Sequence, residues 1–332
     1  MSANGAGPLL EVEGLVVRYP VSRGIVGTLA RRPRRFVDAV ADVSFSIGRG
    51  ELLALVGESG CGKTSTAQAV LRLIRADAGS VRFDGVDVGR LGAGPLRALR
   101  RRMQIIYQDP YESLDPRFRV RATVEEPLAI HHVGSRSERY AAVVHALEQA
   151  GLTPPELYLD RYPHELSGGQ RQRVAIAASL ALGPELLVAD EPVSMLDVSV
   201  RAGILGVLDG LRRAGLAVLM ITHDLSTAAR FADRIAVMYL GRIVEEGPAR
   251  AVIDSPRHPY TKALLSVVPR RDPRHRVNAQ ILRGETPNPI DVPSGCRFHP
   301  RCPVAIPACS ATDPQLEPVG DRHRVACLLA GR

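Results

Sequence analysis

A glycine-rich stretch near the start of the chain has the composition of a phosphate-binding loop. Residues 57–64 are Gly-Glu-Ser-Gly-Cys-Gly-Lys-Thr and fit the pattern G-x-x-x-x-G-K-[ST], here called the P-loop. Glycines let consecutive backbone N–H groups turn toward an anion, and Lys63 and Thr64 suit the β- and γ-phosphates and Mg²⁺. The pattern therefore predicts a nucleotide site. The residues expected to line it are Gly57, Ser59, Gly60, Cys61, Gly62, Lys63, Thr64 and Ser65.

Two acidic residues follow the apolar run 186–189. Asp190, at the end of a buried strand, is placed to hold Mg²⁺ through water. Glu191, one position further, is placed to polarise a water molecule against the γ-phosphate. Alone, such a pair is more typical of a solvated strand end. The P-loop upstream favours the catalytic interpretation.

Four of the five cysteines gather near the C-terminal end of the chain, at Cys296, Cys302, Cys309 and Cys327. Five, six and seventeen residues separate them, which is not the C-x₂-C pairing of common zinc modules. In a reducing compartment such a group indicates a metal site more than disulfides. Four thiolates hold zinc or a 4Fe-4S cluster, and the spacing leaves both open beside free structural thiols.

The elements that position these residues follow from the apolar pattern. The run 52–56 predicts a buried strand that ends at the P-loop, and 65–74 predicts the helix that leaves it. Strands are also expected over 9–19 and 40–47. Asp-Gly in the centre of 81–88 predicts a hairpin.

From about residue 108 to about residue 182, the periodicity of the apolar residues is mainly that of helices. Short apolar runs at 186–189 and 217–221 then predict strands of the parallel type. The remaining segments expected are helices over 137–150, 170–182, 198–214 and 225–232, and a hairpin formed by 235–239 and 242–246. No long periodic segment follows residue 260, and we expect a domain boundary near residue 261.

Composition places the chain among ordinary globular proteins. It has 332 residues, 45% of them apolar, which suggests about two domains. The net charge of +8 is compatible with an anionic partner, although arginines spread along the whole chain favour a merely basic surface. The first residues lack the features of a signal peptide, and no apolar run is long enough to span a bilayer. We therefore expect a cytosolic protein.

The segment Leu166-Ser167-Gly168-Gly169-Gln170 decides between nucleotide-binding families. Together with the P-loop and an Asp-Glu pair that begins 21 residues after Gly169, it resembles the ATP-binding subunits of ABC transporters. The resemblance covers residues 9–260. It implies an α/β fold, a P-loop NTPase cassette of the RecA-like type. This cassette carries an antiparallel β subdomain, a helical signature subdomain over about 108–182, and here a small Cys-rich C-terminal extension.

The same resemblance assigns roles to other residues. Tyr19 matches the aromatic side chain that stacks on adenine, and Gln108 matches a glutamine that contacts Mg²⁺ and the transmembrane partner. Asp197 ends a D-loop in which Met195 stands where alanine is commoner, and His223 matches the histidine that contacts the γ-phosphate. Ser167, Gly168, Gly169 and Gln170 would contact ATP held by Lys63 of an opposite subunit, so that each chain carries two half-sites.

The tail resembles the C-terminal extension of dipeptide/oligopeptide permease ATPases, with nickel permease ATPases as close relatives. The residues that carry this likeness are 258–265 and 295–303, while 107–117, 167–173 and the basic loop 20–36 resemble the F-type subunit. The resemblance implies a D-type ATPase partner, two transmembrane permease subunits and an external solute-binding protein. It also favours a 4Fe-4S cluster over zinc on the four cysteines.

These observations predict an ATPase, with ATP and Mg²⁺, that powers a dipeptide/oligopeptide importer from the cytoplasmic face of the membrane as a peripheral subunit. The predicted domains are 1–260, the nucleotide-binding domain, and 261–332, the extension. Nickel or another solute is an alternative cargo. An ABC ATPase that acts on nucleic acid is a second alternative, disfavoured by the absence of a second cassette, and we expect no nucleic-acid partner. A third alternative is that the tail senses iron or redox state and thereby gates transport.

Overall fold

The computed structural model describes residues 7–21, 35–109, 113–267, 284 and 287–330. Most of the basic loop predicted over 20–36 lies outside these residues, as do residues 110–112 of the segment 107–117. The chain divides into two compact units. The first unit is Met1–Leu9, Ile47–Leu52 and Arg90–Ile221, and the second is Leu10–Ser46, Leu53–Gly89 and Thr222–Arg332.

Three parallel strands form the sheet of the first unit, in the order β6-β7-β8. Their bounds are Met103–Ile106 for β6, Leu186–Asp190 for β7 and Ala217–Thr222 for β8. Every residue of β7 and β8 is buried. Continuous apolar runs are the pattern of strands covered on both faces, so the prediction of parallel strands here is confirmed.

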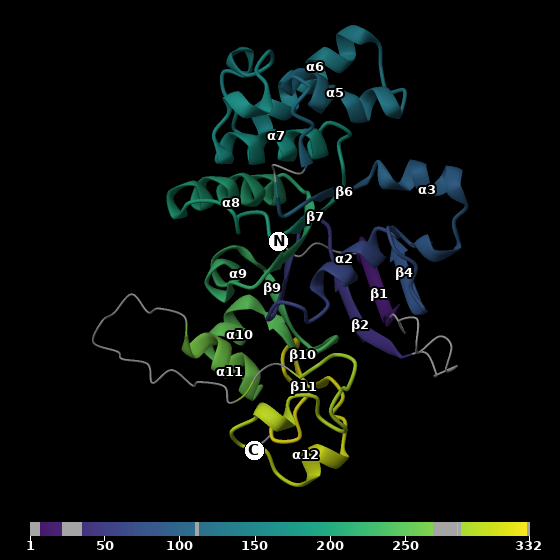
Figure 1. Cartoon of the computed structure of the whole chain (residues 1–332), viewed down its shortest axis with the longest axis vertical. Helices are drawn as coiled ribbons and strands as arrows, with labels where there is room; N and C mark the ends of the chain where they lie inside the picture. Colours follow the sequence, from purple (N-terminus) through teal and green to yellow (C-terminus); the bar gives the residue numbers. More distant parts are fainter. Residues whose placement is uncertain (1–6, 22–34, 110–112, 268–283, 285–286, 331–332) are drawn as a thin grey trace, which may run out of the picture. The chain divides into compact units, whose positions relative to one another are not determined.

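Helices make up most of the remaining first unit. They are α3 (Ala93–Arg100), α5 (Val120–Ile130), α6 (Arg136–Gln149), α7 (Gly168–Leu180) and α8 (Val198–Arg213). The helices α5, α6 and α7 pack against one another and are drawn together in teal and blue in Figure 1. Short 3-10 turns at Pro155–Leu157 and Pro163–Glu165 connect α6 to α7. The prediction that residues 108–182 are mainly helical is thus confirmed.

The second unit contains two sheets. One is antiparallel, in the order β2-β1-β4-β5, and the other places β3 beside β9, followed by β10, β12 and β11. Their bounds are β1 Leu10–Pro20, β2 Phe36–Ile47, β3 Leu52–Val56, β4 Ala78–Phe83, β5 Val86–Asp87, β9 Arg234–Tyr239, β10 Arg242–Pro248, β11 Glu317–Gly320 and β12 His323–Val325.

The turn between β4 and β5 confirms the predicted hairpin. Asp84 and Gly85 both have positive φ, at 51° and 77°. This is the backbone of a type I′ turn, whose twist matches that of the strands on either side. The helices of the second unit are α2 (Lys63–Val70), α9 (Leu225–Phe231), α10 (Ala249–Asp254), α11 (Pro259–Ser266) and α12 (Ala308–Ala311), with 3-10 turns at Val88–Arg90 and His299–Arg301.

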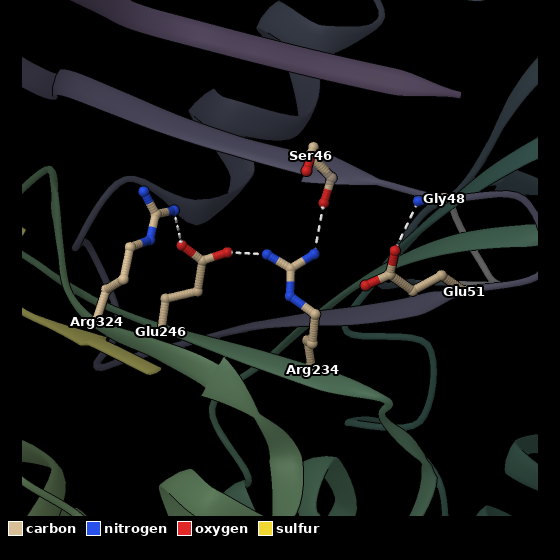
Figure 2. A network of polar contacts seen from close by, with 6 residues as sticks. All are labelled: Ser46, Gly48, Glu51, Arg234, Glu246 and Arg324. Atoms are coloured by element: carbon tan, nitrogen blue, oxygen red, sulfur yellow. Dashed lines mark hydrogen bonds and ion pairs between the residues drawn. The ribbon is translucent and has the colours of Figure 1, made fainter. Parts of the chain in front are cut away.

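A buried carboxylate joins the C-terminal strands to the rest of the second unit. Figure 2 shows Glu246 of β10 between Arg234 of β9 and Arg324 of β12, with Arg234 also donating to the carbonyl of Ser46 at 2.9 Å. The other contact in that view, from the N–H of Gly48 to Glu51, closes a turn of the first unit. Because β12 pairs with β10, residues near the C-terminal end of the described chain are part of this sheet.

One expectation from the sequence needs correction, and one short helix is additional to those predicted. The helix after the P-loop ends at Val70 and not at residue 74, and Arg72 with φ of 51° already has left-handed backbone. The region after residue 260, where no long periodic segment is apparent, contains most of α11, which begins at Pro259 with the ring of His258 capping its first turn at 3.1 Å. Eight residues are too few for a clear periodic signal. Among the described residues, no helix has the length and apolarity needed to cross a bilayer.

Candidate functional site

The P-loop follows the fully buried strand β3, and two of its glycines, Gly57 and Gly62, are required by close backbone contacts. A Cβ on Gly57 would lie 2.2 Å from the carbonyl oxygen of Met238, and one on Gly62 would lie 2.0 Å from that of Ala39. Gly62 also has φ of 106°, which side chains rarely adopt. The loop therefore has its phosphate-binding shape because other backbone segments of the second unit surround it.

Lys63 is held inside this loop, with 5% of its surface exposed. Its ammonium group donates to the carbonyl oxygens of Gly57, at 2.8 Å, and Glu58, at 2.9 Å. The sulfur of Cys61 lies 3.8 Å from the same nitrogen. Burial raises the pKa of the Cys61 thiol, although Lys63 opposes the shift, so the thiol stays protonated and is a packing group.

The opposite face of the P-loop is open. Ser59, Gly60 and Thr64 are exposed, as a site for a ligand requires. Tyr19 from β1 is 38% exposed, and its hydroxyl donates to the hydroxyl of Ser65 in α2 at 3.3 Å. The structure thus brings the predicted adenine-stacking side chain to the helix that begins at the P-loop.

A second group of predicted residues meets at the end of β7 in the first unit. Asp190 is buried, and Glu191 has φ of 47°, a left-handed conformation that costs a non-glycine residue about 1–3 kcal/mol. The N–H of Glu191 donates to Ile221 at 3.0 Å, and the amide of Gln108 donates to its carboxylate at 3.3 Å. Gln108 and Glu191, which are 83 residues apart in the sequence, therefore contact each other.

The segment 166–170 forms the start of α7. The hydroxyl of Ser167 accepts from the N–H of Gln170 at 3.3 Å, and the Gln170 side chain accepts from the N–H of Ser167 at 2.9 Å. This capping box satisfies the first helical N–H groups locally. A Cβ on Gly169 would lie 2.3 Å from the side chain of Val200, while Ser167 itself is exposed. The glycine permits helix packing, and the serine faces outward.

The remaining predicted residues also lie at the surfaces of their units. Asp197 is exposed at the start of α8 and makes no side-chain cap there. His223 is exposed immediately before Asp224, which caps α9 through a 2.8 Å bond from Ser226. The predicted set is thus divided by unit. Tyr19, residues 57–65 and His223 belong to the second unit, and Gln108, residues 167–170, Asp190, Glu191 and Asp197 belong to the first.

The four C-terminal cysteines are neighbours in the second unit. Each of their thiols interacts electrostatically with the other three, and the N–H of Cys296 donates to Cys309 at 2.8 Å. Burial raises the pKa of Cys296 to about 11 and also raises the pKa values of Cys302 and Cys327. However, the described residues contain no group of three or more His, Cys, Asp or Glu side chains arranged to hold a metal ion. The predicted cluster is therefore not confirmed.

Sequence reasoning missed two side chains that contact the P-loop. Arg301 pairs with the carboxylate of Glu58 at 2.8 Å, and the hydroxyl of Tyr260 accepts from the N–H of Glu58 at 3.0 Å. These partners lie 243 and 202 residues from Glu58. No local spacing could have indicated contacts over such separations.

Models of two protein families match the chain. Residues 40–194 match the family described as ABC transporter. Residues 244–309 match the family described as oligopeptide/dipeptide transporter, C-terminal region. The second match begins in β10 and includes three of the four C-terminal cysteines.

Similar proteins extend over the whole chain. A putative peptide import ATP-binding protein of Brucella ovis is 47% identical over 97% of this chain and 98% of its own length. The oligopeptide transport ATP-binding protein AppF of Bacillus subtilis is 41% identical over 99% of both chains. The glutathione import ATP-binding protein GsiA of Salmonella choleraesuis is 48% identical over 85% of this chain, but over 45% of its own length.

Solved structures match the greater part of the chain. A dimer of the ATP-binding cassette MJ0796, in a post-hydrolysis state with ADP and Pi, is 28% identical and covers 73% of this chain and 99% of its own, with a TM-score of 0.62. CbiO1 from Clostridium perfringens, part of an ABC transporter complex, is 28% identical and covers 75% of this chain and 91% of its own, with a TM-score of 0.64.

Proposed function

The chain belongs to the ATP-binding subunits of ABC transporters, in their oligopeptide/dipeptide branch, and on that premise we propose that it hydrolyses ATP to power the import of peptides. The observation that carries the proposal is the P-loop with Lys63 inside it, in a chain that matches peptide import proteins from end to end. Those relatives favour a peptide over nickel as the transported solute. They also favour transport over an action on nucleic acid. Residues 1–260 are the nucleotide-binding domain in this proposal, and 261–332 are its extension.

The P-loop binds the phosphates of ATP. Its N–H groups and the N-terminal end of α2 supply positive potential, and Lys63 exchanges its bonds with loop carbonyls for the β- and γ-phosphates. Tyr19 stacks on the adenine. Mg²⁺, which neutralises charge on the phosphates, would be held by Thr64, Gln108 and Asp190, and all three are oxygen donors of the kind this ion prefers.

Hydrolysis is the transfer of the γ-phosphoryl group to water. Glu191 polarises that water, Gln108 helps to orient it, and His223 contacts the γ-phosphate. The strained backbone of Glu191 and its bond from Gln108 support these roles, because both hold the carboxylate in one orientation. Little covalent chemistry is required of the protein, so positioning is its main contribution.

The signature segment acts on a second subunit. Exposed Ser167, with Gly168, Gly169 and Gln170 at the start of α7, would contact the γ-phosphate of ATP bound to the P-loop of the partner, and Asp197 would lie at the same contact. We take that partner to be a D-type ATPase subunit. The dimer of the similar cassette MJ0796, which holds ADP and Pi, supports such an arrangement.

In this proposal the protein docks to two transmembrane permease subunits and is therefore a peripheral subunit at the cytoplasmic face of the membrane. An external solute-binding protein delivers the peptide to the same permease. A basic hollow in the first unit supports this docking, as does exposed Tyr107 beside Gln108. The arginines that line the hollow are Arg117, Arg119, Arg121, Arg136 and Arg139. Glu125 and Asp160 also line the hollow, and Asp115 pairs with Arg117, so arginines remain in excess and an acidic permease segment is the complementary partner.

The four C-terminal cysteines would hold a 4Fe-4S cluster. Four neighbouring thiols are the donors that such a cluster requires. In the described residues, however, no three of these side chains are arranged to hold a metal ion. If the cluster is present, the protein purified in the absence of oxygen should be brown and contain about four iron atoms per chain. Cys309→Ser should abolish the colour, and Cys61→Ser should not. Zinc without iron would refute the cluster in favour of the alternative metal.

The decisive variant for the function is Glu191→Gln, assayed with the permease partners. It should retain ATP binding and lower ATP turnover by at least about a hundredfold, because it removes the base and keeps the shape. Glu156→Gln, at an exposed position of the same unit, is the matched control and should have normal turnover. Full turnover by the Glu191 variant would remove this residue from the mechanism.

A further inference from the structure

The side chain of Glu58, the second residue of the P-loop, is held by an arginine from the C-terminal extension. The guanidinium of Arg301 lies 2.8 Å from one carboxylate oxygen and 3.3 Å from the other, in the forked geometry of strong Arg–carboxylate pairs. The Arg301 side chain is only 9% exposed, compared with 25% for Glu58. Such shielding from water makes this pair stronger than an ordinary surface ion pair.

A second contact holds the backbone of the same residue. The N–H of Glu58 donates to the hydroxyl of Tyr260 in α11, and Tyr260 is fully buried. Its ring lies 4.7 Å from that of Tyr239 and 5.4 Å from that of Phe298. The aromatic rings therefore keep the hydroxyl in one place, since a buried ring in contact with two others has little freedom to turn.

The aromatic cluster also supports the arginine. Arg301 lies over the ring of Tyr239 at 6.0 Å, and its N–H donates to Phe298 at 3.0 Å in the 3-10 turn His299–Arg301. A guanidinium keeps its proton at any pH at which the protein is folded. The charge is thus permanent.

We propose that Arg301 and Tyr260 are positioning residues for ATP, which hold Glu58 and through it keep the P-loop in its phosphate-binding conformation. The inference rests on the proposed function of the P-loop. It gives the C-terminal extension a task in nucleotide affinity, carried out by side chains that do not touch the nucleotide.

Lys63 explains how the effect reaches the phosphates. Its ammonium donates to the carbonyl of Glu58, so one residue is held at its N–H, its carboxylate and its carbonyl. When ATP binds, the lysine leaves that carbonyl for the phosphates, and the two holds from the extension remain. Without them the loop has more conformations to lose on binding, and affinity falls.

The chain offers a matched control. Arg324 also joins the extension to the cassette through an ion pair with a carboxylate, but its partner is Glu246 of β10, which Arg234 holds as well (Figure 2). Loss of Arg324 therefore removes an ion pair between the same two parts of the chain without releasing the P-loop.

The test measures the dissociation constant of Mg-ATP by calorimetry with the full chain. Arg301→Ala and Glu58→Gln should each raise it about tenfold, which is the loss expected for one charge-assisted hydrogen bond. The double variant should be no worse than either single variant, because both remove the same contact. Tyr260→Phe, which keeps the ring, should raise it several-fold, and Arg324→Ala should leave it unchanged.

In the assembled transporter, the same variants should raise KM for ATP and leave kcat unchanged, a division that general destabilisation would not produce. Additive effects, or an Arg301→Ala protein that binds ATP as the wild type does, would overturn the inference. If Arg301→Ala does not fold, Glu58→Gln and Tyr260→Phe decide by the same criteria. A wild-type protein that does not bind ATP at all would instead refute the proposed function.

Discussion

The P-loop and the signature segment are both glycine-bearing turns that begin a helix, yet they are built differently. In the P-loop, backbone carbonyls of Ala39 and Met238 press on Gly62 and Gly57, and Lys63 is buried. In the signature segment, Ser167 is exposed and takes part in a cap made entirely by neighbouring residues. One loop is shaped by distant parts of its unit and the other by its own sequence.

This difference indicates what each loop needs from its surroundings. Contacts with the Ala39 and Met238 carbonyls constrain the P-loop backbone at Gly62 and Gly57 before a ligand arrives. The signature segment completes its hydrogen bonds by itself and presents a hydroxyl and a helix N-terminus outward. It is therefore suited to a ligand that another subunit brings.

The largest effect should come from Gly62→Ala. The added carbon would meet the Ala39 carbonyl at 2.0 Å on a backbone with φ of 106°, so we expect loss of ATP binding and about 3 kcal/mol or more of stability. Gly183→Ala is the control, since φ there is 63° and the space around it is open. It should cost only about 1 kcal/mol in urea unfolding. Equal losses would mean that crowding does not shape the P-loop.

A pair of serines isolates the function of the signature segment from its capping. Ser167 and Ser135 both form complete capping boxes, at the starts of α7 and α6. Replacement of either by alanine should cost about 1 kcal/mol of stability. Only Ser167→Ala should lower ATP turnover, by at least about tenfold, through its lost bond to phosphate. Unchanged turnover would leave Ser167 as a helix cap.

A smaller effect is expected at Tyr19. Tyr19→Ala should raise the dissociation constant of ATP about fivefold, because it removes stacking on the adenine. Tyr19→Phe should bind normally, since the 3.3 Å bond to Ser65 is exposed and weak. If the two variants are equally impaired, the hydroxyl matters and stacking does not.

The smallest effect concerns an ion pair in the unit that carries the signature segment. Arg102, chiefly, and Arg49 lower the pKa of Glu185 from 4.5 to about 2. A carboxylate with a lowered pKa stabilises the folded protein above its ordinary pKa, and this contribution is lost as the pH falls toward 2. Because the pair is a third exposed, Glu185→Gln should cost less than about 1 kcal/mol at neutral pH. The difference from wild type should shrink in acid, and the same difference at pH 3 would contradict the assignment.

Local patterns predicted the elements well where the signal is short-range. The apolar runs of β7 and β8, the Asp84–Gly85 turn and the helices α6 and α7 all follow from neighbouring residues. The helix α11 was missed because it is short. The positions of Tyr19 beside Ser65 and of Gln108 beside Glu191 agree with the resemblance, but no local pattern determines them.

The order of residues alone determined that this chain carries the chemical groups of an ATPase, because the P-loop, the Asp190–Glu191 pair and the segment 166–170 each act through residue type and spacing. Only the tertiary structure determined what holds those groups in place. Glu58 meets Arg301 and Tyr260 after more than two hundred residues of intervening chain, and Gly62 is needed because Ala39 lies against it. Contacts between distant segments depend on how strands and helices pack, and the spacing of neighbouring residues does not determine which distant segments meet.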